Sequence, residues 1–436
     1  MALPLSPGSA MLNKMSEIQH SGATNRGFQR RDYVKITIFG FALTALWQSM
    51  HMIILPLRIL DFVGEAEKNT YLGLLTLVGL LLAMLVQPIA GAISDRSHLR
   101  WGRRRPFILL GTLIALLLLP GIGFLGSYAA FFIIYCLLQL STNTAQGPYQ
   151  AFIPDMVPAG KRGLASGVKF LLEILGGVAL LYPIAIFMDR YFRGEGILWL
   201  GLVLGILGVV MLVMMSVTIV TVRETPQTSQ PRIPLLTTLR HAFKIDLRTK
   251  RSFLWFLLSR LLIFMAFATI QQFALNYLRD VIGVTRPAEA TARFSIVVVG
   301  TMLAMVYPAG YFSDRIGRKP INIIAGLLGA VGVAVIFLSQ DYGPILIAAG
   351  ILGAAIGAFN STNWALATDL LAKDEEARYL GLTNMATAGG AALARLIGPV
   401  IDVVNRHSEG MGYQVMLLAC FIYFVAGAML VVKIKQ

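Results

Sequence analysis

The sequence contains twelve long apolar segments, and these constrain its fold more than any other feature. A helix of about 20 mostly apolar residues is long enough to cross the hydrocarbon core of a bilayer. Soluble proteins rarely expose large apolar patches, so a soluble fold could not carry twelve such helices. We therefore predict an all-α membrane protein with twelve transmembrane helices, numbered spans one to twelve along the chain: 34–57, 71–93, 106–126, 128–153, 163–188, 197–222, 253–277, 293–312, 320–339, 343–368, 380–402 and 411–432.

The composition of the 436 residues supports this class and argues against several others. Charged residues make up 14% of the chain, against about 25% in a typical soluble domain. The only two cysteines, Cys136 and Cys420, lie inside apolar segments and do not form a disulfide framework. The five histidines show no metal-ligand spacing, and no phosphate-binding loop occurs. We expect no metal, no cofactor and no enzymatic activity.

Lysine and arginine are distributed unevenly between the two sides of the predicted membrane. With the N-terminus in the cytoplasm, 25 of the 37 lie in cytoplasmic segments and 8 in outer segments. Cytoplasmic loops of membrane proteins carry such an excess. We therefore expect both termini in the cytoplasm and a location in the plasma (cytoplasmic) membrane. The net charge of +15 then reflects topology, and no nucleic-acid partner is expected.

Two short motifs recur with a constant offset. The sequence GAISDR at 91–96 recurs as GYFSDR at 310–315, 219 residues later. The sequence STN at 141–143 recurs at 361–363, 220 residues later. The copies lie in spans two and eight and in spans four and ten, so the chain is expected to consist of two six-helix halves in the same membrane orientation.

The repeat and the spans predict four regions. Residues 1–33 form a polar tail without the apolar core of a signal peptide, and we expect a disordered cytoplasmic segment. Residues 34–222 form the first six-helix bundle, 223–252 a basic cytoplasmic linker, and 253–436 the second six-helix bundle.

The loops after spans two and eight share the pattern Gly-x-x-x-Asp-Arg-x-Gly-Arg-Lys/Arg. The copy GYFSDRIGRKP at 310–320 follows it closely, and the copy DRSHLRWGRRRP at 95–106 carries a three-residue expansion. This duplicated loop resembles the signature loop of the major facilitator superfamily. The resemblance implies a transporter of two pseudo-symmetric bundles, related by an axis along the membrane normal. It also implies a central cavity lined by spans one, four, seven and ten.

A narrower resemblance covers mainly residues 84–155. The sequence MLVQPIAG at 84–91, followed by WGRRRPFI at 101–108 and NTAQGP at 143–148, is similar to the sucrose–proton symporters and the wider glycoside–cation symporter group. That group carries a coupling aspartate where this chain has Gln139, and a sugar-binding arginine where it has Gln150. The resemblance implies a sugar-like substrate moved together with H+ or Na+.

Polar side chains recur at helical spacing inside four spans. In span four, Gln139, Asn143, Gln146 and Gln150 lie at positions i, i+4, i+7 and i+11, which places them on one face. Amides suit a neutral polyhydroxylated ligand, because each one both donates and accepts hydrogen bonds. The alternative is that the amides only bond helix to helix. The candidate cavity residues of the other spans are Gln48, His51, Gln272, Asn276, Asn360, Asn363, Trp364 and Arg395.

Ionisable residues inside the spans are candidates for ion coupling. Lys169 and Glu173 lie four residues apart and can pair on one helix face, either as a structural pair or with Glu173 as the group that titrates. His51 titrates near neutral pH when unperturbed, so it is either a proton carrier or a hydrogen-bonded structural group. For Arg260, extension of the side chain to the inner surface is the favoured interpretation. Arg395 lies deeper and either faces the cavity or has a structural role.

The signature loops are expected to form the cytoplasmic gate. Gly91 and Gly310 would let neighbouring spans approach closely. The family resemblance implies that Asp95 meets the start of span eleven near Tyr379, and that Asp314 meets the start of span five near Gly163. The alternative is that the loops are topology signals, and their basic groups also suit anionic lipid headgroups. The remaining gating residues are Arg96, Gly102, Arg103, Arg104, Arg315, Gly317 and Arg318.

These observations favour a monomeric secondary transporter that works by alternating access. The predicted substrate is a small neutral solute, a disaccharide or glycoside, and the predicted partners are H+ or Na+ and membrane lipids. An efflux antiporter for amphipathic molecules is the alternative within transport. A receptor or assembly factor on a transporter scaffold is the alternative outside it, because a fold does not determine a function.

Overall fold

The structure is a computed structural model that describes residues 29–97, 99, 101–224, 251–370 and 376–434. The regular elements of this part of the chain are all helical, and twelve helices are long and apolar enough to cross a membrane. The predicted all-α membrane fold is therefore confirmed. Most of the predicted tail and most of the linker lie outside the described residues.

The first half contains six spans, several of which are interrupted. In chain order they are α2 (Arg30–Thr37), α3 (Phe39–Ser49), η1 (Met50–Ile54) and α4 (Leu55–Ile59) for span one, α5 (Lys68–Asp95), α6 (Arg105–Phe124), α7 (Tyr128–Gln150) with α8 (Phe152–Met156), η2 (Ala159–Lys161) followed by α9 (Arg162–Ala179) with α10 (Leu181–Phe192), and α11 (Leu198–Thr221).

The second half repeats this arrangement with fewer interruptions in its described helices. They are α13 (Arg251–Asp280), α14 (Pro287–Ile316), α15 (Arg318–Leu338), α16 (Tyr342–Asp369), α17 (Glu376–Ala394) with η3 (Arg395–Ile397) and α18 (Gly398–Asn405), and α19 (Met411–Val432). Several helices extend beyond the predicted apolar segments. Helix α14, for example, begins at Pro287, six residues before the predicted start, and the backbone nitrogens of its first turn bond to Asp189 of the other half.

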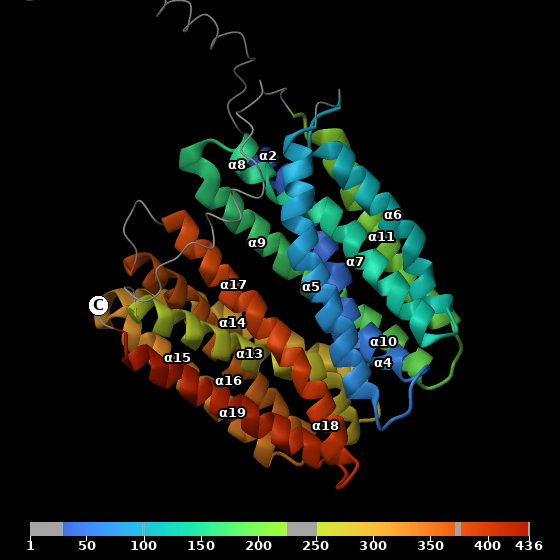
Figure 1. Cartoon of the computed structure of the whole chain (residues 1–436), viewed down its shortest axis with the longest axis vertical. Helices are drawn as coiled ribbons and strands as arrows, with labels where there is room; N and C mark the ends of the chain where they lie inside the picture. The colour runs from blue at the N-terminus through green and yellow to red at the C-terminus, as the bar shows by residue number, and fades with distance from the viewer. Residues whose placement is uncertain (1–28, 98, 100, 225–250, 371–375, 435–436) are drawn as a thin grey trace, which may run out of the picture.

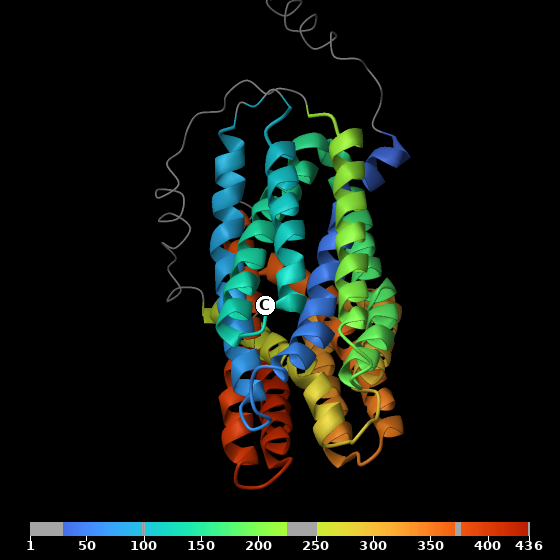
Figure 2. The ribbon, with the colours of Figure 1, turned by 90° about the vertical axis from the view of Figure 1, so that its right-hand side faces the viewer.

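The two halves form two bundles that lie against each other (Figures 1 and 2). Helix α5 packs against α18 and η3, α10 packs against α14, and α13 packs against η1. The bundles converge beside α4 and α18, and their opposite ends are spread apart in Figure 1. We call the converging end, which carries segments 60–67, 281–286 and 406–410, the closed end. The opposite end, with segments 96–104 and 313–318, is the loop end.

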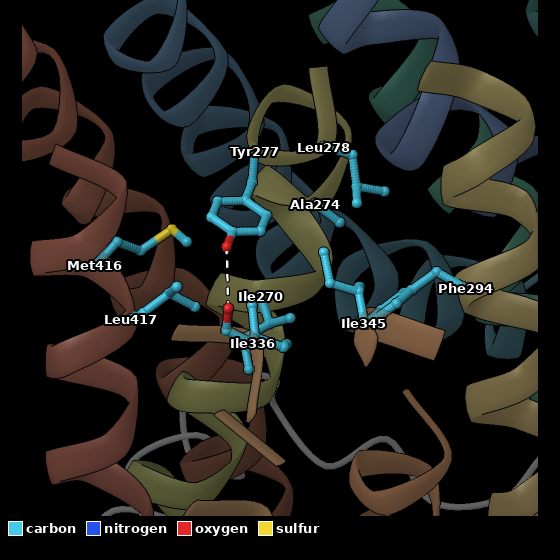
Figure 3. A pocket seen from close by; sticks show the side chains of 9 residues that line it. All are labelled: Ile270, Ala274, Tyr277, Leu278, Phe294, Ile336, Ile345, Met416 and Leu417. Carbon is cyan, nitrogen blue, oxygen red and sulfur yellow. Dashed lines mark hydrogen bonds between the residues drawn. The ribbon is translucent and has the colours of Figure 1, made fainter. Parts of the chain in front are cut away.

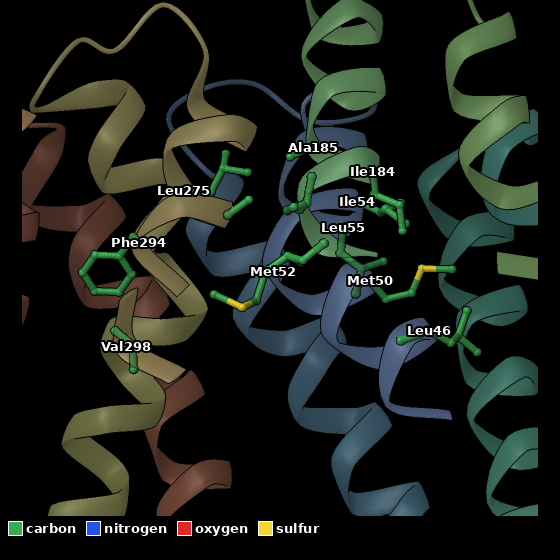
Figure 4. Packing of buried hydrophobic residues seen from close by; sticks show 14 of the residues in the cluster. Leu46, Met50, Met52, Ile54, Leu55, Ile184, Ala185, Leu275, Phe294 and Val298 are labelled. Carbon is green, nitrogen blue, oxygen red and sulfur yellow. The ribbon is translucent and has the colours of Figure 1, made fainter. Parts of the chain in front are cut away.

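Span one is interrupted by a five-residue π-helix, η1, which contains His51 and Met52. Such single π-turns inside α-helices are frequent at functional sites. Met52 extends from this turn toward α13 and α14, whereas Met50 points in the opposite direction (Figure 4). The sulfur of Met52 accepts hydrogen bonds from Gln271 at 3.8 Å and from Ser295 at 3.5 Å, so the π-turn joins the two halves.

Candidate functional site

A chain of hydrogen bonds connects spans one, two and four within the first half. Gln87 donates to Asn143 at 2.7 Å, and Asn143 donates to the side chain of Gln139 at 2.9 Å. Gln139 donates to the hydroxyl of Tyr135 at 3.0 Å, and this hydroxyl lies 3.1 Å from Nε2 of His51. We call these five residues the amide chain. Asn143 and Gln139 are buried, as costly polar groups inside a bilayer usually are.

Helical spacing explains why the amide chain forms. Tyr135, Gln139 and Asn143 lie four residues apart in α7, so their side chains follow one another along one face. The indole ring of Trp47 stacks on the His51 ring at a centroid distance of 5.3 Å. Trp47 also meets the Tyr135 ring edge-on at 6.0 Å. These aromatic contacts hold the imidazole beside the end of the amide chain.

Arg395 brings a positive charge from the second half to this end of the amide chain. It lies in the 3-10 turn η3, close enough to interact electrostatically with both His51 and Tyr135. One of its terminal nitrogens donates to the backbone oxygen of Ala391, while its buried Nε has no partner among the described atoms. The structure therefore places Arg395 at the boundary between the halves, beside predicted site residues.

The equivalent region of the second half is built around Arg260. Its guanidinium donates to Thr387 at 2.8 Å and to Asn363 at 2.5 Å. It also lies over the rings of Phe264 and Trp364, at 4.9 and 5.7 Å. Arg260 is only 6% exposed, so the expected extension to the inner surface is wrong. Partners on α16 and α17 hold the charge inside the bundle instead.

The other predicted cavity residues have different environments. Gln146 and Asn360 are partly buried, and Gln150 is exposed. Gln48 is partly buried and donates to the sulfur of Met52. Trp364 is 40% exposed although it lies beside buried Arg260.

Two further predicted cavity residues, Gln272 and Asn276, are buried on α13. The side-chain nitrogen of Gln272 has no partner among the described atoms, which makes it available to a ligand. Asn276, in contrast, donates to Asn69 of the first half at 2.8 Å. In this conformation Asn276 therefore takes part in a contact between the halves.

Lys169 and Glu173 form the ion pair that their spacing predicts, at 3.3 Å. The ammonium of Lys169 also lies 5.7 Å from the centre of the Tyr149 ring. Glu173 packs closely against Gly40 of span one, where an added Cβ would come within 2.9 Å of the glutamate side chain. About a quarter of each paired side chain remains exposed, so the pair is not fully enclosed by the protein.

The first signature loop is held within its own half. Asp95 pairs with Arg104 and lies 4.0 Å from Arg103, and both arginines also pair with Asp155. The side chain of Tyr379, its expected neighbour, lies outside the described residues. Gly102 has a φ of +110°, a conformation that favours glycine.

The expected role of Gly91 is wrong, because an added Cβ there would meet nothing within 4 Å. The close approach depends instead on Gly147, where a Cβ would lie 2.4 Å from the backbone oxygen of Gln87. Gly147 belongs to α7 and Gln87 to α5. The small residue that lets these helices meet is therefore on span four.

The second signature loop differs in its contacts. Arg318 pairs with Asp369 at 2.5 Å, and Gly317 has a φ of +103°. Asp314 is exposed, and nothing lies within 4 Å of the Cβ position of Gly163, its expected neighbour. Gly310 makes a close approach as expected, since an added Cβ would lie 3.2 Å from Ser361. Arg96 is exposed, and Arg315 lies over the ring of Tyr311.

One residue of the loop end was not anticipated from the sequence. The carboxylate of Glu224 accepts hydrogen bonds from the backbone nitrogens of Arg103, Arg104 and Arg105, at 2.7 to 3.1 Å. Free N–H groups and the dipole of a helix N-terminus favour such a carboxylate. Glu224 therefore holds the chain after span six against the start of α6.

The structure also contains a small apolar cavity inside the second bundle. Its volume is about 20 Å³, and Tyr277 closes one side by donating to the backbone oxygen of Ile336 (Figure 3). Its lining side chains are hydrophobic or aromatic, and it lies apart from the amide chain. This cavity is a packing gap within one half and does not coincide with the candidate site.

Twelve spans, an internal repeat and buried polar groups at the boundary of two bundles define a polytopic membrane protein of two repeated halves. The family model of the Major Facilitator Superfamily matches residues 37–395 and 286–435. The chain belongs to the major facilitator superfamily.

Relatives with known roles match only part of the chain. Sucrose transport protein SUC3 of Arabidopsis thaliana is 30% identical over 133 residues, which cover 26% of this chain and 22% of that protein. Sucrose transport protein SUT1 of Oryza sativa subsp. japonica is 36% identical over 124 residues, 23% of each chain. Solute carrier family 45 member 4 of Mus musculus is 32% identical over 134 residues, 27% of this chain and 17% of that protein. The matched part of this chain spans about a fifth of the length of these relatives.

Solved transporter structures share the fold over nearly the whole chain. The nucleoside transporter NupG aligns with a TM-score of 0.70 at 12% identity, covering 92% of this chain and 98% of that one. A bacterial homolog of the human lysosomal transporter Spinster, in an inward-facing and occupied conformation, aligns with a TM-score of 0.71 at 16% identity, covering 94% and 97%. At such low identity the likeness concerns the fold alone.

Proposed function

We propose that the chain is a secondary active transporter that moves a small neutral sugar-like solute, a disaccharide or glycoside, together with H+ or Na+. The amide chain is the observation that carries this proposal. It brings three amides, a phenol and an imidazole together beside the boundary of the bundles. Such groups recognise hydroxyls as donors and as acceptors, and the partial similarity to sucrose transport proteins supports the same ligand class.

The second half supplies complementary groups. The buried nitrogen of Gln272 lacks a partner, and the exposed face of Trp364 offers an apolar surface for a sugar ring. Arg260 orients Asn363 and lies against the Trp364 ring. A solute bound between these groups and the amide chain would touch both halves, which is how binding can be linked to their relative movement.

We place the loop end in the cytoplasm, because the basic residues concentrate in its segments. The closed end then faces outward, and the structure represents the form open toward the cytoplasm. For coupling we propose Glu173, since Gln139 cannot titrate. His51, beside Arg395, is the second candidate.

Transport into proteoliposomes tests the proposal. Labelled sucrose and a labelled methyl glucoside are supplied outside, with an imposed H+ gradient, an imposed Na+ gradient or neither. We expect uptake above the equilibrium level with one gradient, and loss of this accumulation when an ionophore collapses it. Equilibration without accumulation would reject coupling, and uptake equal to that of protein-free liposomes would reject sugar transport.

A further inference from the structure

Two carboxylates at the closed end reach across the boundary and bind the start of a helix in the other half. Asp189 of α10 accepts hydrogen bonds from the backbone nitrogens of Ala288 and Glu289, at 2.9 and 2.7 Å. Asp402 of α18 accepts from the backbone nitrogen of Thr70 at 2.6 Å and from the side chain of Asn69 at 2.8 Å. Both aspartates are nearly inaccessible, at 1% and 2% exposed.

The two contacts are equivalent under the internal repeat. Span five caps span eight in one, and span eleven caps span two in the other. Thr70 and Glu289, the backbone donors, are separated by the same 219 residues as the two copies of the signature loop. The equivalence of donor positions argues against a chance contact of one loop.

Each capped helix lacks a cap of its own. The side chains of the N-cap residues Glu67 and Arg286 make no capping hydrogen bond to the free backbone N–H groups of their helices. The first N–H groups of a helix have no partner within it, and they favour a negative charge. The free N–H groups at the starts of α5 and α14 therefore depend on an aspartate that belongs to the opposite half.

Other contacts strengthen the junction around Asp402. Lys68 pairs with Asp280 at 2.5 Å, and Arg406 pairs with Glu67 at 2.8 Å, in both cases between the halves. An added Cβ at Gly398 would lie 2.2 Å from the backbone oxygen of Asn69, so the two backbones meet directly. Separating the halves here must break these contacts together and leave the carboxylates and the helix starts to water, which costs free energy.

We propose that Asp189 and Asp402 form a paired outer gate, in which two pseudo-symmetric carboxylate caps hold the closed end shut. The gate opens when both caps break, so the free energies of the two caps add in the equilibrium between the inward-open and outward-open forms. Glu289 beside the first cap is held by Arg286 and Arg293 and keeps the helix start in place.

Cysteine accessibility in membrane vesicles tests this gate. Thr44 is partly buried and lies one turn from Gln48 toward the loop end, so Thr44→Cys, in a background with Cys136→Ser and Cys420→Ser, reports on access from outside. The variants Asp189→Asn, Asp402→Asn and the double variant are labelled with a membrane-impermeant maleimide applied at the outer face. Asp341→Asn, a loss of the same charge on an exposed residue of an outer loop, is the matched control.

Asparagine keeps one acceptor oxygen but loses the charge and one of the two hydrogen bonds of each cap, which corresponds to a change of about 2- to 30-fold in an equilibrium constant. We expect each single variant to speed outside labelling by a factor in this range, and the double variant to speed it by the product of the two. Labelling from the loop end should slow in parallel, which shows that the protein is folded and has shifted its conformation. The gate would be overturned if the double variant were labelled from outside no faster than the Asp341→Asn control. The pairing would be overturned if only one of the two aspartates affected the rate of labelling.

Discussion

At the scale of single residues, the structure separates buried polar groups that are satisfied from those that are available. Asn143 bonds to Gln139 and to Gln87, and Gln139 also bonds to Tyr135, so both amides already have partners before any solute binds. Gln272 is buried, yet its nitrogen has no partner among the described atoms. A buried donor without a partner destabilises the folded state, and its persistence is consistent with a ligand-binding role.

Gln272→Leu should therefore separate stability from function. The substitution removes an unsatisfied buried group, so we expect an unchanged or higher melting temperature in detergent. Loss of one hydrogen bond to the solute should raise KM for sugar uptake by about 2- to 13-fold, from about 0.5–1.5 kcal/mol. Leu117→Ala, on an exposed apolar position of α6, is the control for an unrelated change in a span. A melting temperature that falls while KM stays constant would assign Gln272 to structure alone.

Glu173→Gln tests the proposed coupling residue. We expect gradient-driven accumulation of sugar to fall to a concentration ratio of about one, while exchange of labelled for unlabelled sugar continues. A purely structural pair would instead give an unstable single variant, because Lys169 would lose its partner. The double variant Lys169→Met, Glu173→Gln removes both charges and decides between these explanations.

If the double variant is stable and still accumulates sugar, the pair is structural, and His51 becomes the candidate to examine. The exposed pair Arg193–Glu195 offers a control, since Glu195→Gln removes a surface ion pair of the same type. Exposed pairs contribute about 0–1 kcal/mol, so this control should change neither accumulation nor stability by much.

At the scale of helices, close packing sets the position of the amide chain. Helix α7 approaches α5 at Gly147, and this approach brings Gln87 within bonding distance of Asn143. The π-turn in span one has a related effect, because it places His51 beside Tyr135 and aims Met52 at the second half. Small residues and helix irregularities thus position polar groups that the membrane would otherwise disfavour.

Gly147→Ala should push these helices apart. The added methyl group would lie 2.4 Å from a backbone oxygen, so the helices must separate and the bond from Gln87 to Asn143 must lengthen. Overpacking of this kind costs about 1–3 kcal/mol, and we expect a lower melting temperature together with weaker sugar binding. Gly205→Ala is the matched control, because nothing lies within 4 Å of its Cβ position. If the two variants have the same melting temperature and bind sugar equally well, the close approach at Gly147 is not needed for stability or for binding.

At the scale of the whole molecule, the contacts divide unequally between the two ends. Polar contacts between the halves gather at the closed end and at the π-turn, including the caps by Asp189 and Asp402. At the loop end, in contrast, Asp95 of the first signature loop is paired with Arg104 of its own half. Movement of the two bundles would exchange one set of contacts for the other, as alternating access requires.

Asp95→Asn tests the gate expected at the loop end. In the present form Asp95 is about half exposed, and Arg104 keeps Asp155 and Ser94 as partners without it, so the pair of Asp95 with Arg104 contributes little. A contact with a helix start of the other half is worth about 0.3–2 kcal/mol in the opposite form. We expect the variant to shift the equilibrium toward the present form by up to about 30-fold, which would speed labelling of Thr44→Cys from the cytoplasmic side. Labelling at the parental rate would contradict a latch at Asp95.

The sequence by itself determined the twelve spans, the two halves and the face of span four that carries the amides. Lipid imposes these features locally, because each span must satisfy its own backbone and each polar face must turn away from hydrocarbon. Tyr135, four residues before Gln139, could have been added to that face by the same spacing. The ion pair of Lys169 and Glu173 was equally predictable, since both lie on one helix.

Only the tertiary structure decided which residues meet across helices and across the two halves. The position of Arg260 against Asn363, the cap of α14 by Asp189 and the approach at Gly147 join residues far apart in the sequence. Their partners depend on how the bundles tilt against each other. No local pattern encodes that arrangement, because helical periodicity determines which residues share a face and not which neighbouring helix that face meets.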